Sequence, residues 1–196
     1  MPDYQFEQKR RTNISSETLN RCNWVRKDDQ LMELYHDEEW GTPTHDDVRL
    51  FEIISLEIAQ AGLSWLTILN KRAGYREAFN NFDFHRIANY DYAKIESLLT
   101  NVKIVRNRLK ILATINNAAR ALEVRDKFGS LDAYFWRFAP LVQRNAYGYL
   151  AESAAMSKQL RSEGWKFIGP TICNSFMQAA GLINDHDEGC FRRFSD

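Results

Sequence analysis

Apolar side chains recur at the three- and four-residue spacing of amphipathic helices from residue 30 onward, and this period constrains the fold more than any other feature. No run of strict alternation bounded by hairpin turns interrupts it. Hydrophobic residues make up 44% of the 196-residue chain, which is enough to build a core. The sequence therefore predicts an all-α protein.

The clearest expected helix begins after Pro43, where Thr44 and Asp47 stand at capping-box spacing. Leu50 and Ile54 then share the apolar face of this helix. Further helices are expected at residues 70–80, 92–100, 106–122, 131–138, 154–164 and 171–181. The order of helix, short link at 101–105 and helix is the outline of a helix-hairpin-helix.

The chain is expected to form one two-lobed domain over residues 21–194, with a helix-hairpin-helix lobe at about 46–122 and a second lobe built from both terminal segments. Residues 1–20 contain a basic run and little apolar periodicity, so we interpret them as a flexible arm. No apolar stretch is long enough for a membrane span, and the start does not resemble a secretory signal. With only three cysteines, the chain is expected in the cytoplasm.

The formal net charge of +0 argues against a nucleic-acid partner, but the charges are unevenly distributed. Residues 1–100 carry 12 basic and 17 acidic side chains, whereas residues 101–170 carry 12 and 5. A central basic block can face a polyanion while acidic flanks keep the whole chain neutral. The block includes the predicted hairpin and the helix after it.

One carboxylate lies on the wrong side of the helix that follows Pro43. At 100° per residue, Glu57 falls beside Leu50 and Ile54, whereas Glu52 falls on the opposite, polar side. A buried carboxylate needs a cation, hydrogen-bond donors or a ligand that supplies them. Glu57 is therefore either satisfied structurally by an arginine or backbone amides, or it is a site acid that binds a cationic heterocycle beside Trp65.

Two pairs of residues have the spacing of metal ligands. Cys22 and His36 are 14 residues apart near the start, and His186 and Cys190 are 4 apart near the end. Each pair alone has a structural explanation, but together they form a Cys₂His₂ set suited to one structural Zn²⁺ that joins the two ends of the fold. No His-Glu-x-x-His sequence indicates a hydrolytic zinc, and no phosphate loop or nucleophile elbow is present.

Several motifs, in order, resemble the bacterial 3-methyladenine DNA glycosylase I family. They are Arg21-Cys22-Asn23-Trp24, Tyr35-His36-Asp37-Glu38-Glu39-Trp40-Gly41, Leu56-Glu57, Gln60-Ala61-Gly62-Leu63-Ser64-Trp65, Ile104-Val105-Arg106-Asn107-Arg108, Gly164-Trp165-Lys166-Phe167-Ile168-Gly169-Pro170-Thr171 and Asn184-Asp185-His186. The resemblance covers residues 21–190, nearly the whole chain. It implies a helix-hairpin-helix glycosylase fold with zinc tying the terminal segments together.

The resemblance also implies a monofunctional N-glycosylase that flips and excises N3-methyladenine from alkylated double-stranded DNA, with 3-methylguanine as a second candidate base. Glu57 would be the catalytic residue, an anion that reads the hydrogen-bond donors and the charge of the base, and Tyr35, Trp65 and Trp24 would form its pocket. The product would be free 3-methyladenine, without a lyase step, and the protein would be a monomer associated with the nucleoid.

DNA contacts are expected from two segments. The turn from Gln60 to Ser64, including Leu63, corresponds to the element that enters the duplex, and the hairpin segment contributes Lys103, Arg106 and Arg108. Lys103 stands where the family often has glycine, so its phosphate contact would depend on charge. Two other functions fit the same sequence: a zinc-stapled lesion-binding module without catalysis, and an enzyme acting on another cationic heterocycle.

Overall fold

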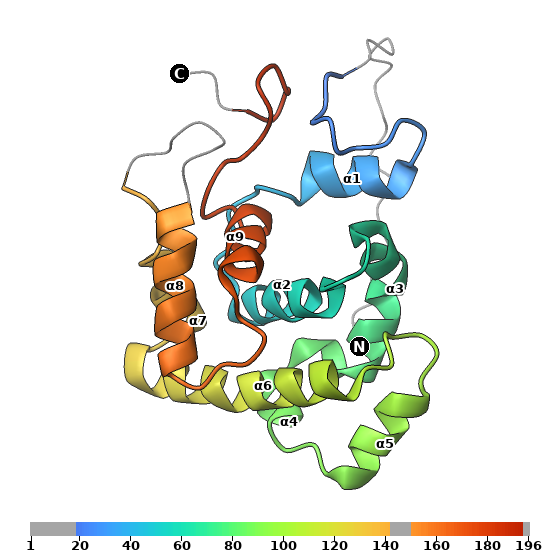
Figure 1. Ribbon diagram of the computed structural model, residues 1–196, viewed down its shortest axis with the longest axis vertical. Helices are drawn as coiled ribbons and strands as arrows, with labels where there is room; N and C mark the ends of the chain where they lie inside the picture. The colour runs from blue at the N-terminus through green and yellow to red at the C-terminus, as the bar shows by residue number, and fades with distance from the viewer. Residues whose placement is uncertain (1–18, 142–149, 194–196) are drawn as a thin grey trace, which may run out of the picture.

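The structure is a computed structural model that describes residues 19–141 and 150–193, and within these ranges the only regular elements are helices (Figure 1). The helices are α1 (Gln30–Glu38), α2 (Asp47–Gln60), α3 (Trp65–Ala78), the 3₁₀ turn η1 (Asn80–Phe82), α4 (Phe84–Ile87), α5 (Tyr92–Thr100), α6 (Arg108–Phe128), α7 (Leu131–Trp136), α8 (Leu150–Ser162) and α9 (Pro170–Ala179). The predicted all-α class is confirmed. No helix in the described part is both long and apolar enough to cross a bilayer.

Helix α2 lies at the centre of the molecule and contacts α3, α6, α7 and α9 (Figure 1). Ten of its consecutive residues, from Leu50 to Ala59, are buried, because neighbours cover the helix on all sides. Leu50 and Ile54 are fully buried, as the helical period predicts. Gln60, at the end of α2, is only partly buried, and the chain continues from it through a short turn into α3.

Local capping explains where the helices differ from the predicted ranges. The range 92–100 is confirmed as α5, but the predicted start of α2 at Thr44 is wrong, because Asp46 is the N-cap and accepts from the N–H of Arg49. Asn107 caps α6 in the same way, so that helix starts at Arg108. Ser64 caps α3, which therefore begins at Trp65 rather than at residue 70. Helices α1 and α4 have no counterpart among the expected ranges.

The segment before α1 and the segment after α9 lie side by side, far apart in sequence but joined by hydrogen bonds. The side chain of Asn20 donates to the carbonyl of Gly189 at 2.7 Å, and its own carbonyl accepts from Phe191 at 2.9 Å. The backbone of Asn23 donates to Asp187 at 2.7 Å. Residues 1–18 of the predicted arm lie outside the described residues, but Asn20 is already tied to the fold.

Candidate functional site

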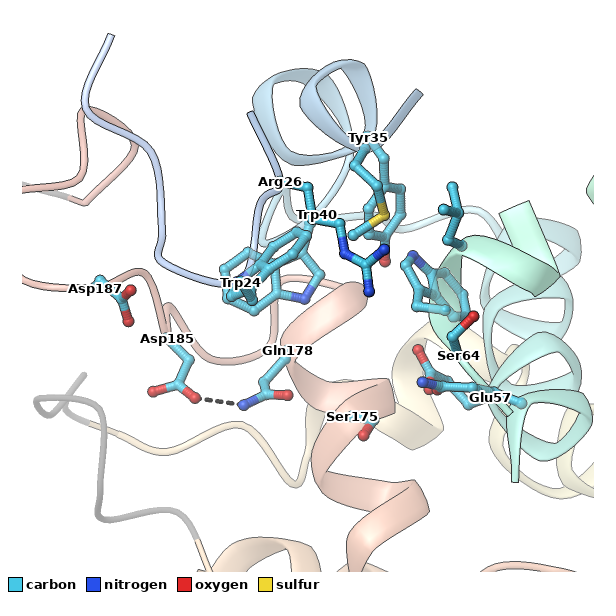
Figure 2. A pocket seen from close by; sticks show the side chains of 14 residues that line it. Trp24, Arg26, Tyr35, Trp40, Glu57, Ser64, Ser175, Gln178, Asp185 and Asp187 are labelled. Carbon is cyan, nitrogen blue, oxygen red and sulfur yellow. Dashed lines mark hydrogen bonds between the residues drawn. The ribbon is translucent and has the colours of Figure 1, made fainter. Parts of the chain in front are cut away.

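A pocket of about 440 Å³ opens between α1, the end of α2, the start of α3 and α9 (Figure 2). Its volume is in the range of small-molecule sites. Its lining comes from three stretches of the chain, 24–40, 57–66 and 175–187: Trp24, Arg26, Met32, Tyr35, Trp40, Glu57, Gln60, Ser64, Trp65, Leu66, Ser175, Gln178, Asp185 and Asp187. Aromatic rings form the upper wall in Figure 2, and Glu57 and Asp185 lie at opposite sides.

Glu57 is buried in the wall of this pocket. Only 4% of the residue is exposed, and no hydrogen-bond donor or cation among the described residues contacts its carboxylate. Burial raises the pKa of Glu57 to about 8. The structural explanation that an arginine or backbone amides satisfy this acid finds no support in the described residues, so the carboxylate remains available to a ligand.

Glu52 is a second buried acid on α2, and the prediction that it points to a polar surface is wrong. It is only 6% exposed, because α3 packs over this side of α2. Unlike Glu57, it has counter-ions: Arg76 donates at 2.7 Å and Arg49 lies at 2.9 Å. The two glutamates thus share one helix and one degree of burial but differ in partners.

The predicted base-binding aromatic residues are brought together around the pocket. The rings of Tyr35 and Trp65 have centroids 5.2 Å apart, and Trp24 lies 6.3 Å from Tyr35 and 5.1 Å from Trp40. These separations are typical of packed aromatic pairs. Tyr35 comes from α1, Trp65 begins α3, and Trp24 precedes α1, so three elements converge on one aromatic wall (Figure 2).

The four predicted metal ligands also meet, behind this aromatic wall. The ligand atoms of Cys22, His36, His186 and Cys190 all lie within 4.8 Å of one another, and all four residues are buried. Cys22 Sγ is 3.4 Å from His186 Nδ1, and Cys190 Sγ is 3.4 Å from His36 Nε2. Around a tetrahedral Zn²⁺ with ordinary bond lengths, sulfur and nitrogen ligands are about 3.5 Å apart, so the spacing fits such an ion.

The surroundings of the cluster suit a metal as well. Asp37 contacts His36 Nδ1 at 2.8 Å, which leaves Nε2 directed at the cluster. The backbone amides of Asp187 and Arg192 donate to the two sulfurs, at 3.2 Å to Cys22 and 3.4 Å to Cys190. Burial lowers the pKa of His186 to about 4, which favours the neutral form that binds metals.

The predicted DNA-entering turn lies at the rim of the pocket. Gln60 and Ser64 line the pocket mouth, whereas Leu63 between them is 41% exposed. Gly62 has a φ of +79°, a backbone conformation that few other residues adopt, and this allows the chain to turn tightly after the end of α2. The turn therefore presents an apolar side chain beside the opening of a base-sized pocket.

The connection at residues 101–107 is held by α3. Lys71 donates to the carbonyl of Val102 at 2.9 Å, and the N–H of Val105 donates to the hydroxyl of Tyr75 at 3.1 Å. Gly74 permits this approach, since a Cβ there would lie 2.6 Å from Cβ of Lys103. The connection is thus braced from one side by a single helix.

The three predicted DNA-contacting basic residues near this connection differ in their partners. Lys103 Nζ bonds Glu77 at 2.6 Å and Arg108 bonds Glu96 at 2.6 Å, both in exposed ion pairs. Arg106 is exposed and has no ion pair within the described residues. Its charge is therefore the most available of the three.

Several lining residues were not singled out from the sequence. They are Arg26, Met32, Leu66, Ser175, Gln178, Asp185 and Asp187. Gln178 donates to Asp185, which joins α9 to the segment that carries His186 (Figure 2). A sequence pattern could have indicated two of them. Ser175 and Gln178 are polar and three residues apart on α9, a helix whose other face is apolar.

The described residues form an all-helical fold with an acidic, aromatic-walled pocket beside an exposed turn, an arrangement whose chemistry suits a small flat cation. Comparison with known proteins names the family. The chain belongs to the methyladenine glycosylase family, whose model matches residues 24–193. It is 42% identical over 180 residues to DNA-3-methyladenine glycosylase 1 of Escherichia coli (strain K12), covering 88% of this chain and 96% of that protein.

Solved structures agree with this assignment. A crystal structure of 3-methyladenine DNA glycosylase I superimposes with a TM-score of 0.83 at 44% identity, covering 89% of this chain and 100% of the other. A structure that describes 3-methyladenine recognition by the Staphylococcus aureus protein gives a TM-score of 0.82 at 33% identity, covering 91% of this chain and 98% of the other. The fold is therefore shared over nearly the whole described chain.

Proposed function

We propose that the protein is a monofunctional DNA N-glycosylase that removes N3-methyladenine from alkylated duplex DNA and so starts base excision repair. The observation that carries this proposal is Glu57, a buried carboxylate that has no partner among the described residues, in a pocket walled by aromatic rings. A cationic base supplies the positive counter-ion that the Glu57 carboxylate lacks, and the flat ring of the base fits between aromatic side chains. The name of the Escherichia coli relative and the 3-methyladenine recognition described for the Staphylococcus aureus protein support the same substrate.

The reaction breaks one C–N bond and forms one C–O bond. N3-methylation places a positive charge on the adenine, so the electron pair of the C1′–N9 bond moves onto the base, which leaves as neutral 3-methyladenine. Water adds to C1′ and loses a proton. Because the leaving group is activated already, the protein's main tasks are to extrude the nucleotide and hold the base while the sugar carries positive charge.

Glu57 contributes both to binding of the charged base and to the transition state of bond cleavage. In the empty pocket burial keeps Glu57 largely protonated near pH 7, because its pKa is raised to about 8, and a cationic base favours its ionised form. The carboxylate then accepts hydrogen bonds from the base and attracts the cation, while Tyr35, Trp65 and Trp24 shape the pocket and stack on the base. Normal adenine is neutral and has a stronger glycosidic bond, so it gains less from the pocket and reacts less readily. Among the described residues no lysine lines the pocket, so none is placed to form a Schiff base with C1′. The strand would then be left intact at an abasic site.

DNA is proposed to bind across the 61–64 turn and the helix-hairpin-helix formed by α5, residues 101–107 and α6. Leu63 enters the space that the extruded nucleotide leaves, with Gln60 beside it. Arg106 contacts backbone phosphate through its unpaired charge, and Arg108 and Lys103 contribute after exchanging their glutamate partners for phosphate. The hairpin lobe is taken as residues 46–122.

The Cys₂His₂ cluster is proposed to hold one structural Zn²⁺ per chain. The ion would neutralise the two buried thiolates and stabilise the lobe formed by the terminal segments. The rings of Trp40 and His186 pack in a T-shaped arrangement with centroids 4.6 Å apart, so the lobe formed by the terminal segments also supports the pocket wall. The protein is proposed to act as a monomer on chromosomal DNA in the cytoplasm.

The test is single-turnover release of 3-methyladenine from a methylated duplex. We expect release by the wild-type protein, with strand cleavage only after alkali, and a loss of about 100-fold or more in Glu57→Gln. Glu52→Gln is the matched control, since it changes an equally buried acid on the same helix that does not line the pocket. Tight binding to methylated duplex without base release would instead identify a lesion-binding module.

A further inference from the structure

Lys110 of α6 makes an unusual pair of contacts with the end of α2. Its Nζ donates to the carbonyl of Ala59 at 2.8 Å and to the carbonyl of Ala61 at 2.6 Å. It has no ion pair among the described residues, and partial burial lowers its pKa. The ammonium is therefore committed to backbone oxygens rather than to a carboxylate.

These carbonyls belong to a helix end whose C-cap, Ala61, uses its own N–H to bond the carbonyl of Ile58. Helix α2 carries no basic residue in its last turn, and its final residues lead directly into the turn at 61–64. A cation at this position interacts favourably with the negative end of the helix dipole and satisfies carbonyls that lack helical partners. Here Lys110 supplies the cation from a different helix.

The backbone of Lys110 is engaged as well. Its N–H donates at 3.2 Å to the side chain of Asn107, the N-cap of α6, where the 101–107 connection ends. Lys110 therefore links the start of α6 to the end of α2. Its main chain belongs to the first turn of α6, and its side chain bonds the last carbonyls before Gly62 and Leu63. Movement of the hairpin helix would be transmitted to the turn through these two hydrogen bonds.

We propose that Lys110 is a positioning residue that fixes the 61–64 turn against α6, in the orientation in which Leu63 enters the duplex. The inference rests on the proposed function, in which the hairpin binds phosphate and the turn fills the gap left by the extruded nucleotide. Lys110 is not one of the residues that line the pocket. Its role is to couple binding of the DNA backbone to insertion at the lesion.

Lys110→Met keeps the length of the side chain but removes the ammonium. We would measure affinity for a duplex with a tetrahydrofuran abasic site, affinity for the undamaged duplex over a salt series, and quenching of tryptophan fluorescence by free 3-methyladenine. The preference for the abasic duplex should fall by about 10- to 100-fold, since loss of positioning by about 1 Å has such effects. Affinity for the free base and the salt dependence on undamaged DNA should stay unchanged.

Two further variants make the result specific. Lys110→Arg should keep most of the preference, because a guanidinium can donate to both carbonyls. Lys127→Met removes the same charge from the exposed far end of α6, where Nζ lies 5.2 Å above the ring of Phe128, and should leave the preference unchanged.

Three outcomes would overturn the inference. An unchanged preference in Lys110→Met would show that the turn does not depend on this residue. Equal weakening on both duplexes, with a salt slope reduced by about one, would indicate a phosphate contact. A parallel loss of free-base affinity would mean that Lys110 supports the pocket. Failure of the wild-type protein to release 3-methyladenine would contradict the proposed function instead.

Discussion

Replacing Glu57 by glutamine should stabilise the protein while it abolishes the proposed activity. The unfolded chain ionises this carboxyl near pH 4.5, whereas burial raises its pKa in the folded protein to about 8. Between these pH values the unfolded state has lost a proton that the folded state retains, so the free energy of unfolding falls as the pH rises. The slope is about 1.4 kcal/mol per pH unit.

From pH 5 to pH 8 this slope amounts to about 4 kcal/mol at most, since water that enters the pocket solvates the carboxylate and reduces the effect. Glutamine has the shape of glutamate and does not ionise. Glu57→Gln should therefore match the wild-type protein near pH 4.5 and become progressively more stable than it toward pH 8. Urea denaturation of both proteins at pH 5, 6.5 and 8 measures this difference.

Glu52→Gln supplies the contrast on the same helix. Its carboxylate is paired with Arg49 and Arg76, so its removal should destabilise the protein at pH 8 by about 1–3 kcal/mol. The change in the free energy of unfolding would then have opposite signs for two equally buried glutamates, because only Glu52 has counter-ions among the described residues. If Glu57→Gln gains no stability between pH 5 and pH 8, or loses it as Glu52→Gln does, the assignment of Glu57 as an unpaired acid is refuted.

Three further predictions concern the metal, the hairpin and DNA. Metal analysis should find one Zn per chain, and Cys190→Ser should lose the metal and lower the urea midpoint; a metal-free protein of full stability would contradict this. Arg106→Ala should reduce the salt slope of DNA binding by about one, and Arg108→Ala by less because of its ion pair; an unchanged slope in both variants removes DNA from this surface. Gly74→Ala should cost about 1–3 kcal/mol by forcing the connection away from α3, as measured by thermal unfolding, and normal stability would show that the segment around Lys103 adjusts freely.

Much of the fold and the candidate site follows from local pattern. The three- and four-residue period predicts the helices, and it places Glu57 beside Leu50 and Ile54 in the core because helical geometry is set by the backbone alone. It does not predict that the opposite side of α2, with Glu52, is buried as well. The Cys and His residues could be paired from spacing and chemistry, and the structure brings all four together. Helix starts were less accurate, since Asp46, Asn107 and Ser64 compete with nearby residues of similar capping tendency.

The tertiary structure decided which buried charges have partners. The sequence does not show which of Glu52 and Glu57 has counter-ions, because one of the two arginines that pair with Glu52 comes from a different helix, α3. The contact of Lys110 with α2 likewise joins residues about 50 positions apart. The sequence by itself determined the helical class, the acid in the core and the ligand set, which depend on backbone period and side-chain chemistry. Packing decided that Glu57 faces an aromatic pocket and has no counter-ion in the described part of the chain, because pairing between charges depends on distances that only the folded chain defines.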